Sequence, residues 1–315
     1  MAVLRGRLIE EVRGTLAKTG FFLTPRHSER GLCFDFVARR DRTLLFVKVL
    51  QNIDAFSKGN AEELKLIAQT LGGVPVVVGE RSGSGRLEDG VAYSRFGVPI
   101  LSTVTFLEYF EEGVPPFIYS APGGLYVRLD VDALRRAREE RQISLGILAE
   151  IAGVSRRTIQ MYLEGMSATM DIAMRLEEFL GEALAVPVDP FAFTPERRPL
   201  TDLLAGLRGL ERDVLSRLER LGYDVLPIIR SPFEALTQHQ ETTLLTGVGE
   251  GDETLVRKAE VVSDLSRVVE RGAVLFARRR RSRISLRGIP IIDRDELRRA
   301  KDLESVEELI AERTG

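Results

Sequence analysis

The chain contains 315 residues, of which 44% are hydrophobic and 29% charged, and this length accommodates two or three domains with separate cores. The net charge of −2 excludes indiscriminate binding to polyanions, and the single cysteine, Cys33, excludes an internal disulfide framework and cysteine-based zinc sites. No apolar run approaches the roughly 18 residues of a membrane span, so we expect a cytoplasmic protein, and no motif indicates a metal or a cofactor.

Residues 1–116 are predicted to form an α/β domain. A helix over residues 4–18 precedes three strand-like runs, and residues 61–73 have the pattern of a second helix that ends at a glycine. The apolar run VPVVVGE is typical of a strand buried on both faces, and a further strand and a closing helix follow it. The predicted element order is α-β-β-β-α-β-β-α.

Two polar residues, Asp35 and Lys48, lie on neighbouring predicted strands of this domain. Their placement and the element order resemble the PD-(D/E)xK nucleases, as in archaeal Holliday-junction resolvase-like proteins. The resemblance implies a restriction-endonuclease-like fold in which two carboxylates hold Mg²⁺ and a lysine lies near the attacking water. Phe46 occupies the position of the second carboxylate, and a benzyl group cannot ligate a hard cation. We therefore predict an inactive domain in which Asp35 and Lys48 are remnants of such a site.

Residues 117–184 are predicted to hold a β-hairpin, turned by Ala-Pro-Gly-Gly, and then a helical DNA-binding domain whose first helix is capped by Asp132. The stretch SLGILAEIAGVSRRTIQMYLE predicts two short helices. Ser144 and Ser155 are suitable N-caps for them, and Gly153 is placed where the chain must turn sharply. A small residue four positions before that glycine, with apolar residues one and six positions after it, is typical of a helix-turn-helix.

The second of these helices, residues 155–164, opens with polar side chains suited to base edges and phosphates. The residues predicted to contact DNA are Ser155, Arg156, Arg157, Thr158, Gln160 and Met161. Residues 132–182 carry nine acids and seven arginines, so binding must come from a local basic face, chiefly Arg156 and Arg157, rather than from net charge.

The run LRRAREERQISLGILAEIAGVSRRTIQMYLEG resembles the Cro/cI type of helix-turn-helix, and the match is specific over residues 132–180. The layout of the whole chain resembles that of archaeal HTH-type transcriptional regulators. One position departs from the pattern, because Leu163 stands where such modules often carry an acidic residue. We expect this exchange to alter local packing or a polar contact and to leave the fold intact.

Residues 185–200 contain four prolines and predict a linker. Residues 201–315 repeat landmarks of the first domain in the same order, so we predict a second α/β domain that is a divergent duplicate of the first. In this alignment Val248 takes the place of Lys48, and the second copy also lacks nuclease chemistry. The arginine-rich stretch Arg278–Arg287 is either a solvated edge or a secondary phosphate-contacting patch.

The predicted fold is therefore two α/β domains around a small all-α helix-turn-helix domain, and the predicted function is sequence-specific, non-enzymatic regulation of transcription. Two alternatives remain open: a DNA-processing enzyme of the PD-(D/E)xK type, and an adaptor that links basal transcription factors to DNA. One module covers few base pairs, so we expect a homodimer on a palindromic operator, held by apolar edge strands such as VPVVVGE. The two related domains could instead pair within one chain.

Overall fold

The computed structural model describes residues 2–26, 31–192, 207–279 and 283–314. We refer to residues 1–116 as the first α/β region, 117–192 as the helix-turn-helix region and 207–315 as the second α/β region. The chain divides into two compact units, one of residues 1–19, 49–56 and 76–193, the other of residues 20–48, 57–75 and 194–315. The first α/β region thus contributes to both units, whereas each of the other two regions lies within one. The division into three domains remains a prediction.

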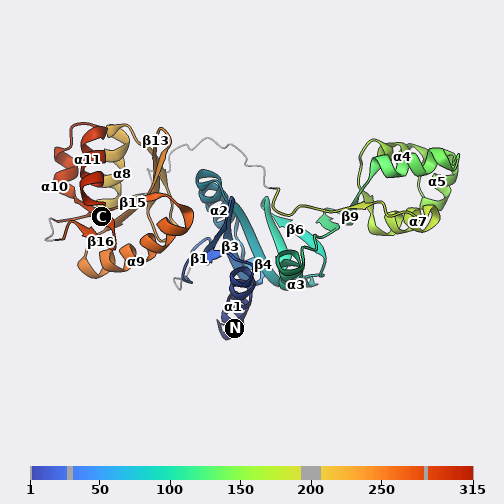
Figure 1. The fold of residues 1–315 in the computed structure, drawn as a ribbon, viewed down its shortest axis with the longest axis horizontal. Coiled ribbons are helices and arrows are strands. Elements are labelled where there is room, and N and C mark those ends of the chain that lie inside the picture. Colours follow the sequence, from blue (N-terminus) through green and yellow to red (C-terminus); the bar gives the residue numbers. More distant parts are fainter. Residues whose placement is uncertain (1, 27–30, 193–206, 280–282, 315) are drawn as a thin grey trace. The chain divides into compact units, whose positions relative to one another are not determined.

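Helices and strands follow one another in the first α/β region much as predicted (Figure 1). Its helices are α1 (Ala2–Lys18), α2 (Lys58–Leu71) and α3 (Thr103–Leu107), with a 3-10 turn, η1 (Ile53–Ala55), before α2 and a π-helical segment, η2 (Glu108–Glu112), after α3. Its strands are β1 (Phe22–Leu23), β2 (Phe36–Arg40), β3 (Thr43–Asn52), β4 (Val74–Ser82), β5 (Gly85–Arg86), β6 (Val91–Arg95) and β7 (Val98–Ser102).

The sheet of this region runs in the order β1-β2-β3-β4-β7-β6, with the short β5 folded back on β4. Strand β4 contains the VPVVVGE run, and its Val76, Val77 and Val78 are fully buried, which confirms a strand covered on both faces. It lies between β3 and β7. The expectation that VPVVVGE is an edge strand available for dimerisation is therefore wrong, because both of its edges are already paired.

Strand β6 is an element that the sequence prediction missed. It pairs antiparallel with β7 through a two-residue turn, Phe96–Gly97, in which both residues have positive φ, 54° and 76°. This conformation suits the twist of a tight hairpin, and it is uncommon for phenylalanine. The hairpin was not predicted because Phe96 stands at a turn position where asparagine, aspartate or glycine is expected.

The second α/β region repeats this architecture. Its helices are α8 (Gly209–Leu221), α9 (Asp252–Val269), α10 (Arg294–Arg299) and α11 (Leu303–Arg313). Its strands are β12 (Asp224–Pro227), β13 (Ala235–His239), β14 (Thr242–Gly249), β15 (Gly272–Ala277), β16 (Ser285–Leu286) and β17 (Ile289–Asp293). The strand order β12-β13-β14-β15-β17-β16 matches β1-β2-β3-β4-β7-β6 position by position, as expected of a duplicated fold. Residues 201–206 of the predicted second domain lie outside the described residues.

The strand register corrects the alignment of the two copies by one residue. Asp35 donates its backbone N–H to the carbonyl of the residue before Lys48, at 2.8 Å, and Glu234 donates to the carbonyl of the residue before Gly247, at 2.9 Å. Gly247, and not Val248, therefore stands in the place of Lys48. The second copy lacks the strand lysine as predicted, although the residue that replaces it is different.

The helix-turn-helix region begins with a hairpin, as predicted. Its elements are β8 (Ile118–Ala121), β9 (Gly124–Leu129), α4 (Val131–Glu140), α5 (Leu145–Ala152), α6 (Arg156–Leu163), β10 (Ala168–Thr169), α7 (Met170–Leu180) and β11 (Ala185–Val186). Strand β8 pairs in parallel with β6, so the hairpin extends the sheet of the first α/β region. Strand β11 pairs with β9, so sheet pairing continues into the predicted linker, whose residues 193–200 lie outside the described part of the chain.

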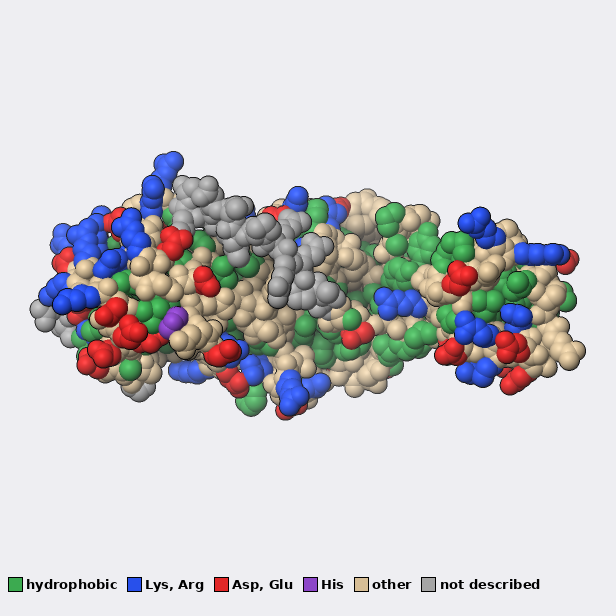
Figure 2. All heavy atoms as spheres, turned by 90° about the horizontal axis from the view of Figure 1, so that it is seen from above, with side chains coloured by type: hydrophobic (Ala, Val, Ile, Leu, Met, Phe, Trp, Pro, Cys, Tyr) green, Lys and Arg blue, Asp and Glu red, His purple; other side chains and the backbone are tan. Residues whose placement is uncertain are grey.

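Charged side chains of both signs lie close together on the helix-turn-helix region, at the right-hand end of Figure 2. No broad surface of one sign is visible on this face, in line with the near balance of acids and arginines in the sequence. Among the described residues, no helix is both long and apolar enough to cross a membrane.

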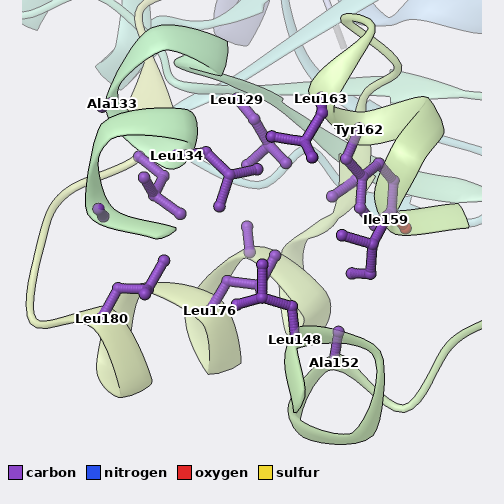
Figure 3. Close-up of a cluster of buried hydrophobic side chains, with 14 of the residues drawn as sticks. Leu129, Ala133, Leu134, Leu148, Ala152, Ile159, Tyr162, Leu163, Leu176 and Leu180 are labelled. Atoms are coloured by element: carbon purple, nitrogen blue, oxygen red, sulfur yellow. The ribbon is translucent and has the colours of Figure 1, made fainter. Parts of the chain in front are cut away.

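The core of this region draws side chains from the hairpin as well as from all four helices (Figure 3). Leu129 of β9 packs with Leu134 of α4, Leu148 of α5, Ile159 of α6 and Leu176 of α7 in one buried cluster. Strand β9 is thus part of the helical domain's core and also of the sheet. The helix-turn-helix is held by this packing and by strand pairing.

Candidate nucleic-acid interface

Two capped helices and a tight turn form the helix-turn-helix at the predicted positions. The Ser144 and Ser155 hydroxyls accept the N–H groups of the third residues of α5 and α6, at 3.2 and 3.1 Å. Gly153 has φ 69° and ends α5. The first helix differs from the prediction, because its N-cap is Asp130 and Asp132 lies within its first turn. The sequence offered two aspartates two residues apart, and only the backbone angles decide between them.

The recognition helix α6 has one buried face and one polar face. Ile159, Tyr162 and Leu163 are buried in the core, so Tyr162 packs inside and Leu163 fills a core position where an acid would be costly. The exposed positions on the opposite face are Arg156, Arg157, Gln160, Met161 and Glu164. Four of the six predicted DNA contacts are therefore accessible together on one side of the helix.

The other two predicted contacts are engaged at the helix N-terminus. The Ser155 hydroxyl is 2.9 Å from the Thr158 hydroxyl and also accepts the Thr158 N–H. These two hydrogen bonds stabilise the first turn of α6, so the first role of both hydroxyls is to cap the helix. The N-terminal end of α6 carries partial positive charge from the helix dipole and no acidic side chain in its first turn.

A glycine in the preceding helix makes room for Arg156. A Cβ on Gly146 would lie 3.1 Å from Nη2 and 3.3 Å from Nε of Arg156, so the guanidinium packs over the α5 backbone. Glycine in a helix interior costs roughly 0.5–1 kcal/mol relative to alanine. The sequence shows Gly146 only as a weakness in α5, whereas the structure shows that it allows Arg156 to lie close to the helix.

Two further arginines, which the sequence analysis missed, secure the C-terminal ends of the two helices. Arg175 of α7 donates to the carbonyl of Ala152, the last residue of α5, at 3.0 Å. Arg135 of α4 donates to the carbonyl of Leu163, the last residue of α6, at 2.9 Å. Terminal helix carbonyls lack partners within the helix, and a cation also interacts favourably with the dipole there. These pairs are 23 and 28 residues apart, and no local sequence signal reveals them.

The degenerate nuclease-like site is a buried ion pair. The Lys48 ammonium lies 3.5 Å from a carboxylate oxygen of Asp35 and donates to the carbonyl of Leu32 at 2.5 Å. Phe46 is buried beside them, and its ring meets Phe34 edge-on at a centroid distance of 5.7 Å. The structure therefore brings Asp35 and Lys48 together, and an aromatic side chain fills the position where a second carboxylate would be required.

The equivalent place in the second region also holds an acid and a lysine, but the lysine comes from another element. Lys258 of α9 contacts the Glu234 carboxylate and donates to the carbonyl of Val248 at 2.6 Å. Burial raises the pKa of Glu234, and the Lys258 charge opposes that rise. Sequence comparison could not find this pair, because the lysine lies eleven residues after the aligned position Gly247.

Neither site offers the ligands of a divalent metal. Magnesium takes oxygen ligands, and nuclease chemistry needs at least two converging carboxylates. Asp35 and Glu234 each face a lysine ammonium instead. Over the described ranges, no three His, Cys, Asp or Glu side chains are grouped so that they could hold a metal ion. The residues present do not fit a catalytic metal, and no hydrolytic step can be derived for them.

Two family models match this chain. A PD-(D/E)XK superfamily domain matches residues 5–116, and a helix-turn-helix matches residues 134–186. No solved structure matches the chain. The first α/β region is thus similar to the nuclease superfamily in fold.

Similar proteins of nearly the same length occur in several archaea, and they carry the name "Putative HTH-type transcriptional regulatory protein". The protein of Methanosarcina acetivorans is 37% identical over 97% of this chain and 96% of its own length. The protein of Halobacterium salinarum is 38% identical over 98% of this chain and 98% of its own length. The protein of Pyrococcus horikoshii is 38% identical over 97% of this chain and 97% of its own length. The similarity covers both α/β regions and the helix-turn-helix together. The chain belongs to this family of archaeal HTH-type transcriptional regulatory proteins.

Proposed function

We propose that the protein is a sequence-specific DNA-binding transcriptional regulator that acts in the cytoplasm and reads the major groove with α6. The observation that carries this proposal is the exposed face of α6, where Arg156, Arg157, Gln160 and Met161 lie together beside a capped, acid-free helix N-terminus. An α-helix fits the major groove, and the N-terminal residues of a recognition helix reach the base edges.

The exposed side chains have different roles on DNA. Arginine recognises guanine through two hydrogen bonds and glutamine recognises adenine, so Arg157 and Gln160 are the best candidates for base reading. Arg156 packs over α5 at Gly146 and is restrained near the helix N-terminus, which suits a phosphate contact. Met161 is 41% exposed and offers apolar contact to a thymine methyl group.

The test begins with selection of bound oligonucleotides from a random pool by the full chain. Binding of the selected duplex is then measured by fluorescence anisotropy for Arg157→Ala, Gln160→Ala and Arg156→Ala. A base-reading residue costs about 1–3 kcal/mol on its own site and relaxes specificity at one base pair, whereas a phosphate contact weakens all sequences alike. Arg212→Ala, an exposed arginine of α8, is the control. Unchanged affinity in all three α6 variants would exclude α6 as the reading helix.

Gly146→Ala separates DNA binding from folding. The added methyl group improves α5 by about 0.5–1 kcal/mol, and it also displaces the Arg156 guanidinium from its position 3.1 Å away. We expect a more stable protein with weaker DNA binding. Thermal unfolding and anisotropy on the same sample measure the two effects, and stronger binding by the variant would contradict the role given to Arg156.

The proposal includes the absence of nuclease activity. Phe46 fills the position of the second carboxylate and Lys48 pairs with Asp35, so the first α/β region supplies a scaffold and no hydrolysis. Incubation with Mg²⁺ or Mn²⁺ should leave linear, nicked and branched DNA intact. Cleavage that disappears in Asp35→Ala would overturn this part of the proposal.

We also propose a twofold homodimer on a palindromic operator, because one recognition helix of eight residues covers only a few base pairs. Strand β4 cannot supply the contact, since both its edges are paired. Light scattering on the full chain measures the mass directly. A 35.2 kDa monomer that binds a single half-site tightly would contradict the dimer. Basal transcription factors are further candidate partners, and binding of a purified factor without DNA would support an adaptor role.

A further inference from the structure

A loop of the second α/β region contacts the degenerate site of the first. The backbone N–H of Arg230 donates to Oε2 of Glu63 at 2.6 Å, and its guanidinium Nη1 donates to Oε1 at 2.9 Å. The carbonyl of the same residue accepts the backbone N–H of Cys33 at 2.8 Å. Arg230 thus uses its side chain, its N–H and its carbonyl on two elements of the first region.

These contacts lie beside the acid–lysine pair. Cys33 is two residues before Asp35, and its neighbour Leu32 accepts the hydrogen bond from Lys48. Glu63 lies on α2, the helix that follows the strand carrying Lys48. The first turn of α2 accommodates the guanidinium, because a Cβ on Gly59 would lie only 3.2 Å from Nη1 of Arg230. Arg230 therefore packs against the α2 backbone at a position where any side chain larger than glycine would crowd it.

The charges at this place complement each other. The Glu63 side chain is 14% exposed, and a carboxylate buried to that degree needs a cation or several donors. Arg230 supplies both, with two hydrogen bonds from one residue to the two carboxylate oxygens. Within the first α/β region, Lys48 is already paired with Asp35. The cation for Glu63 therefore comes from a residue 167 positions away.

A second contact joins the same two regions. Arg39, on β2, lies 2.5 Å from the Glu270 carboxylate at the end of α9 and donates to the carbonyl of Val269 at 3.4 Å. This pair is more exposed than the first, since the Glu270 side chain is 62% exposed. It indicates that the two regions meet at more than one point, and that the Glu63 carboxylate is the more buried of the two acids.

We infer that the second α/β region closes the degenerate nuclease-like site of the first, with Arg230 as a built-in cation for Glu63. The two related regions form a pseudo-dimer within one chain through this contact. The closed site keeps DNA away from the acid–lysine pair and fixes the loop before β13 against α2. This role goes beyond DNA reading by α6 and does not depend on it.

The only cysteine of the chain reports on this contact. Cys33 is fully buried, and its backbone N–H is bonded to Arg230. Burial raises the pKa of the Cys33 thiol, with a further rise from the nearby Glu63 charge. A water-soluble maleimide therefore reacts with Cys33 only after local or global opening, and the rate measures how often the site opens.

The experiment follows maleimide labelling of the full chain in native buffer by intact mass. Arg230→Ala removes the side-chain contact and should speed labelling by about tenfold or more, and Glu63→Gln should speed it to a similar extent. Arg230→Lys keeps the charge with fewer donors and should fall between wild type and Arg230→Ala. Arg212→Ala, a variant at an exposed arginine of the same region, should label at the wild-type rate.

Two further measurements make the result decisive. Urea unfolding of each variant shows how far labelling could rise through global unfolding alone, and the inference requires a rise in Arg230→Ala beyond that amount. Labelling rates from 1 to roughly 100 μM protein should be identical, because the contact lies within one chain. The inference would be overturned if Arg230→Ala labelled at the wild-type rate, or if its faster labelling were explained fully by lost global stability. It would also be overturned if the protection of Cys33 from labelling vanished on dilution.

Discussion

The two α/β regions share one strand order, yet they obtain their buried lysine from different elements. In the first region Lys48 reaches Asp35 from β3, and in the second Lys258 reaches Glu234 from α9. The strand position of Lys48 holds Gly247 in the second region, where a Cβ would lie 2.5 Å from Cδ2 of Leu275. The acid occupies the equivalent position in both regions, directly before β2 or β13, whereas the lysine comes from β3 in the first region and from α9 in the second.

This difference shows what the pair does. Nuclease chemistry fixes the lysine beside metal-bound carboxylates, and within the described parts of both regions no three His, Cys, Asp or Glu side chains are grouped for a metal. A buried carboxylate does require a compensating cation, whichever element carries it. Charge compensation therefore explains why a lysine is present at both acids despite its different origin. The acid–lysine pair is a structural feature of both regions.

The largest expected effect comes from removing the buried lysine of the first region. Lys48→Ala leaves the Asp35 carboxylate without its ammonium partner and should cost about 3–5 kcal/mol in the free energy of unfolding. Lys258→Ala should cost roughly half as much, because the Lys258 and Glu234 side chains are 20% and 16% exposed, against 8% and 6% for Lys48 and Asp35. Urea unfolding measures both.

Neutral replacement of the whole pair tests the structural explanation. Asp35→Asn combined with Lys48→Met removes both charges at similar volume and should recover most of the stability lost in Lys48→Ala. Lys301→Ala, at an exposed lysine, should be neutral. A Lys48→Ala variant that loses less than about 1 kcal/mol would show that the pair is not needed for charge compensation.

A pair of glycines should show the next largest effect. A Cβ on Gly73 would meet Cε2 of Phe46 at 2.8 Å and the backbone oxygen of Leu44 at 2.9 Å. A Cβ on Gly272, at the start of β15, would meet only the Cδ2 atom of a leucine, at 2.6 Å. A leucine methyl group can rotate away, whereas a strand carbonyl cannot. Gly73→Ala should therefore cost about 2 kcal/mol and Gly272→Ala clearly less, and equal losses by thermal unfolding would contradict this explanation.

The helices that follow β17 in the second region and β7 in the first, α10 and α3, have different N-caps. In the second region the Glu296 carboxylate completes the capping box of α10 and binds Arg313 at 2.9 and 2.8 Å. Hydrogen bonds from Arg313 lower the pKa of Glu296 from 4.5 to about 2. In the first region Ser102 caps α3 with a hydroxyl, which lies 2.9 Å from the Thr105 hydroxyl and donates to the Asp89 carboxylate at 2.6 Å.

Glu296→Gln should therefore destabilise the protein by about 1.5 kcal/mol at pH 7. A lowered folded pKa gives stability that is fully present above the unfolded value and is lost as the pH falls through the folded value. The difference from wild type should shrink between pH 4.5 and about pH 2. For Arg212→Ala, at an exposed arginine of α8, the difference from wild type should not change over this range. Urea unfolding at several pH values tests both, and a constant loss in Glu296→Gln would contradict the assignment.

Local patterns were sufficient to predict the helix-turn-helix. The caps Ser144 and Ser155, the turn at Gly153 and the apolar spacing all act over a few residues, so the sequence determines them directly. The repeated order of helices and strands was also predictable, because each element has its own period and its own stop signal. The central position of β4 was not, since strand order depends on pairing between distant segments.

The contacts that the sequence concealed are those between distant side chains. Arg135 and Arg175 cap helices from other elements, Lys258 replaces a strand lysine from a helix, and Arg230 reaches Glu63 from the other α/β region. Each requires the fold before the partners can be matched. The one-residue error in aligning the copies has the same cause, because threonine–leucine runs match at two offsets and only the strand register distinguishes them.

The smallest expected effect concerns the arginine-rich stretch that the second region has in place of the first region's loop at residues 82–90. Arg278 lies 3.4 Å from Glu250 and Arg287 lies 2.8 Å from Glu260, and all four side chains are about half exposed. Exposed pairs contribute little, so Arg278→Ala and Arg287→Ala should each change stability by less than about 0.5 kcal/mol.

Their effect on DNA binding distinguishes a solvated edge from a phosphate contact. Each phosphate contact adds about 1 to the slope of log affinity against log salt concentration, and losing one lowers the slope by that amount. Because Glu250 and Glu260 already compensate these arginines, we expect Arg278→Ala and Arg287→Ala to leave the slope unchanged, whereas Arg156→Ala in α6 should lower it. A lower slope in either variant of the stretch would show that the second α/β region also contacts DNA, which would be a difference in function between the two copies.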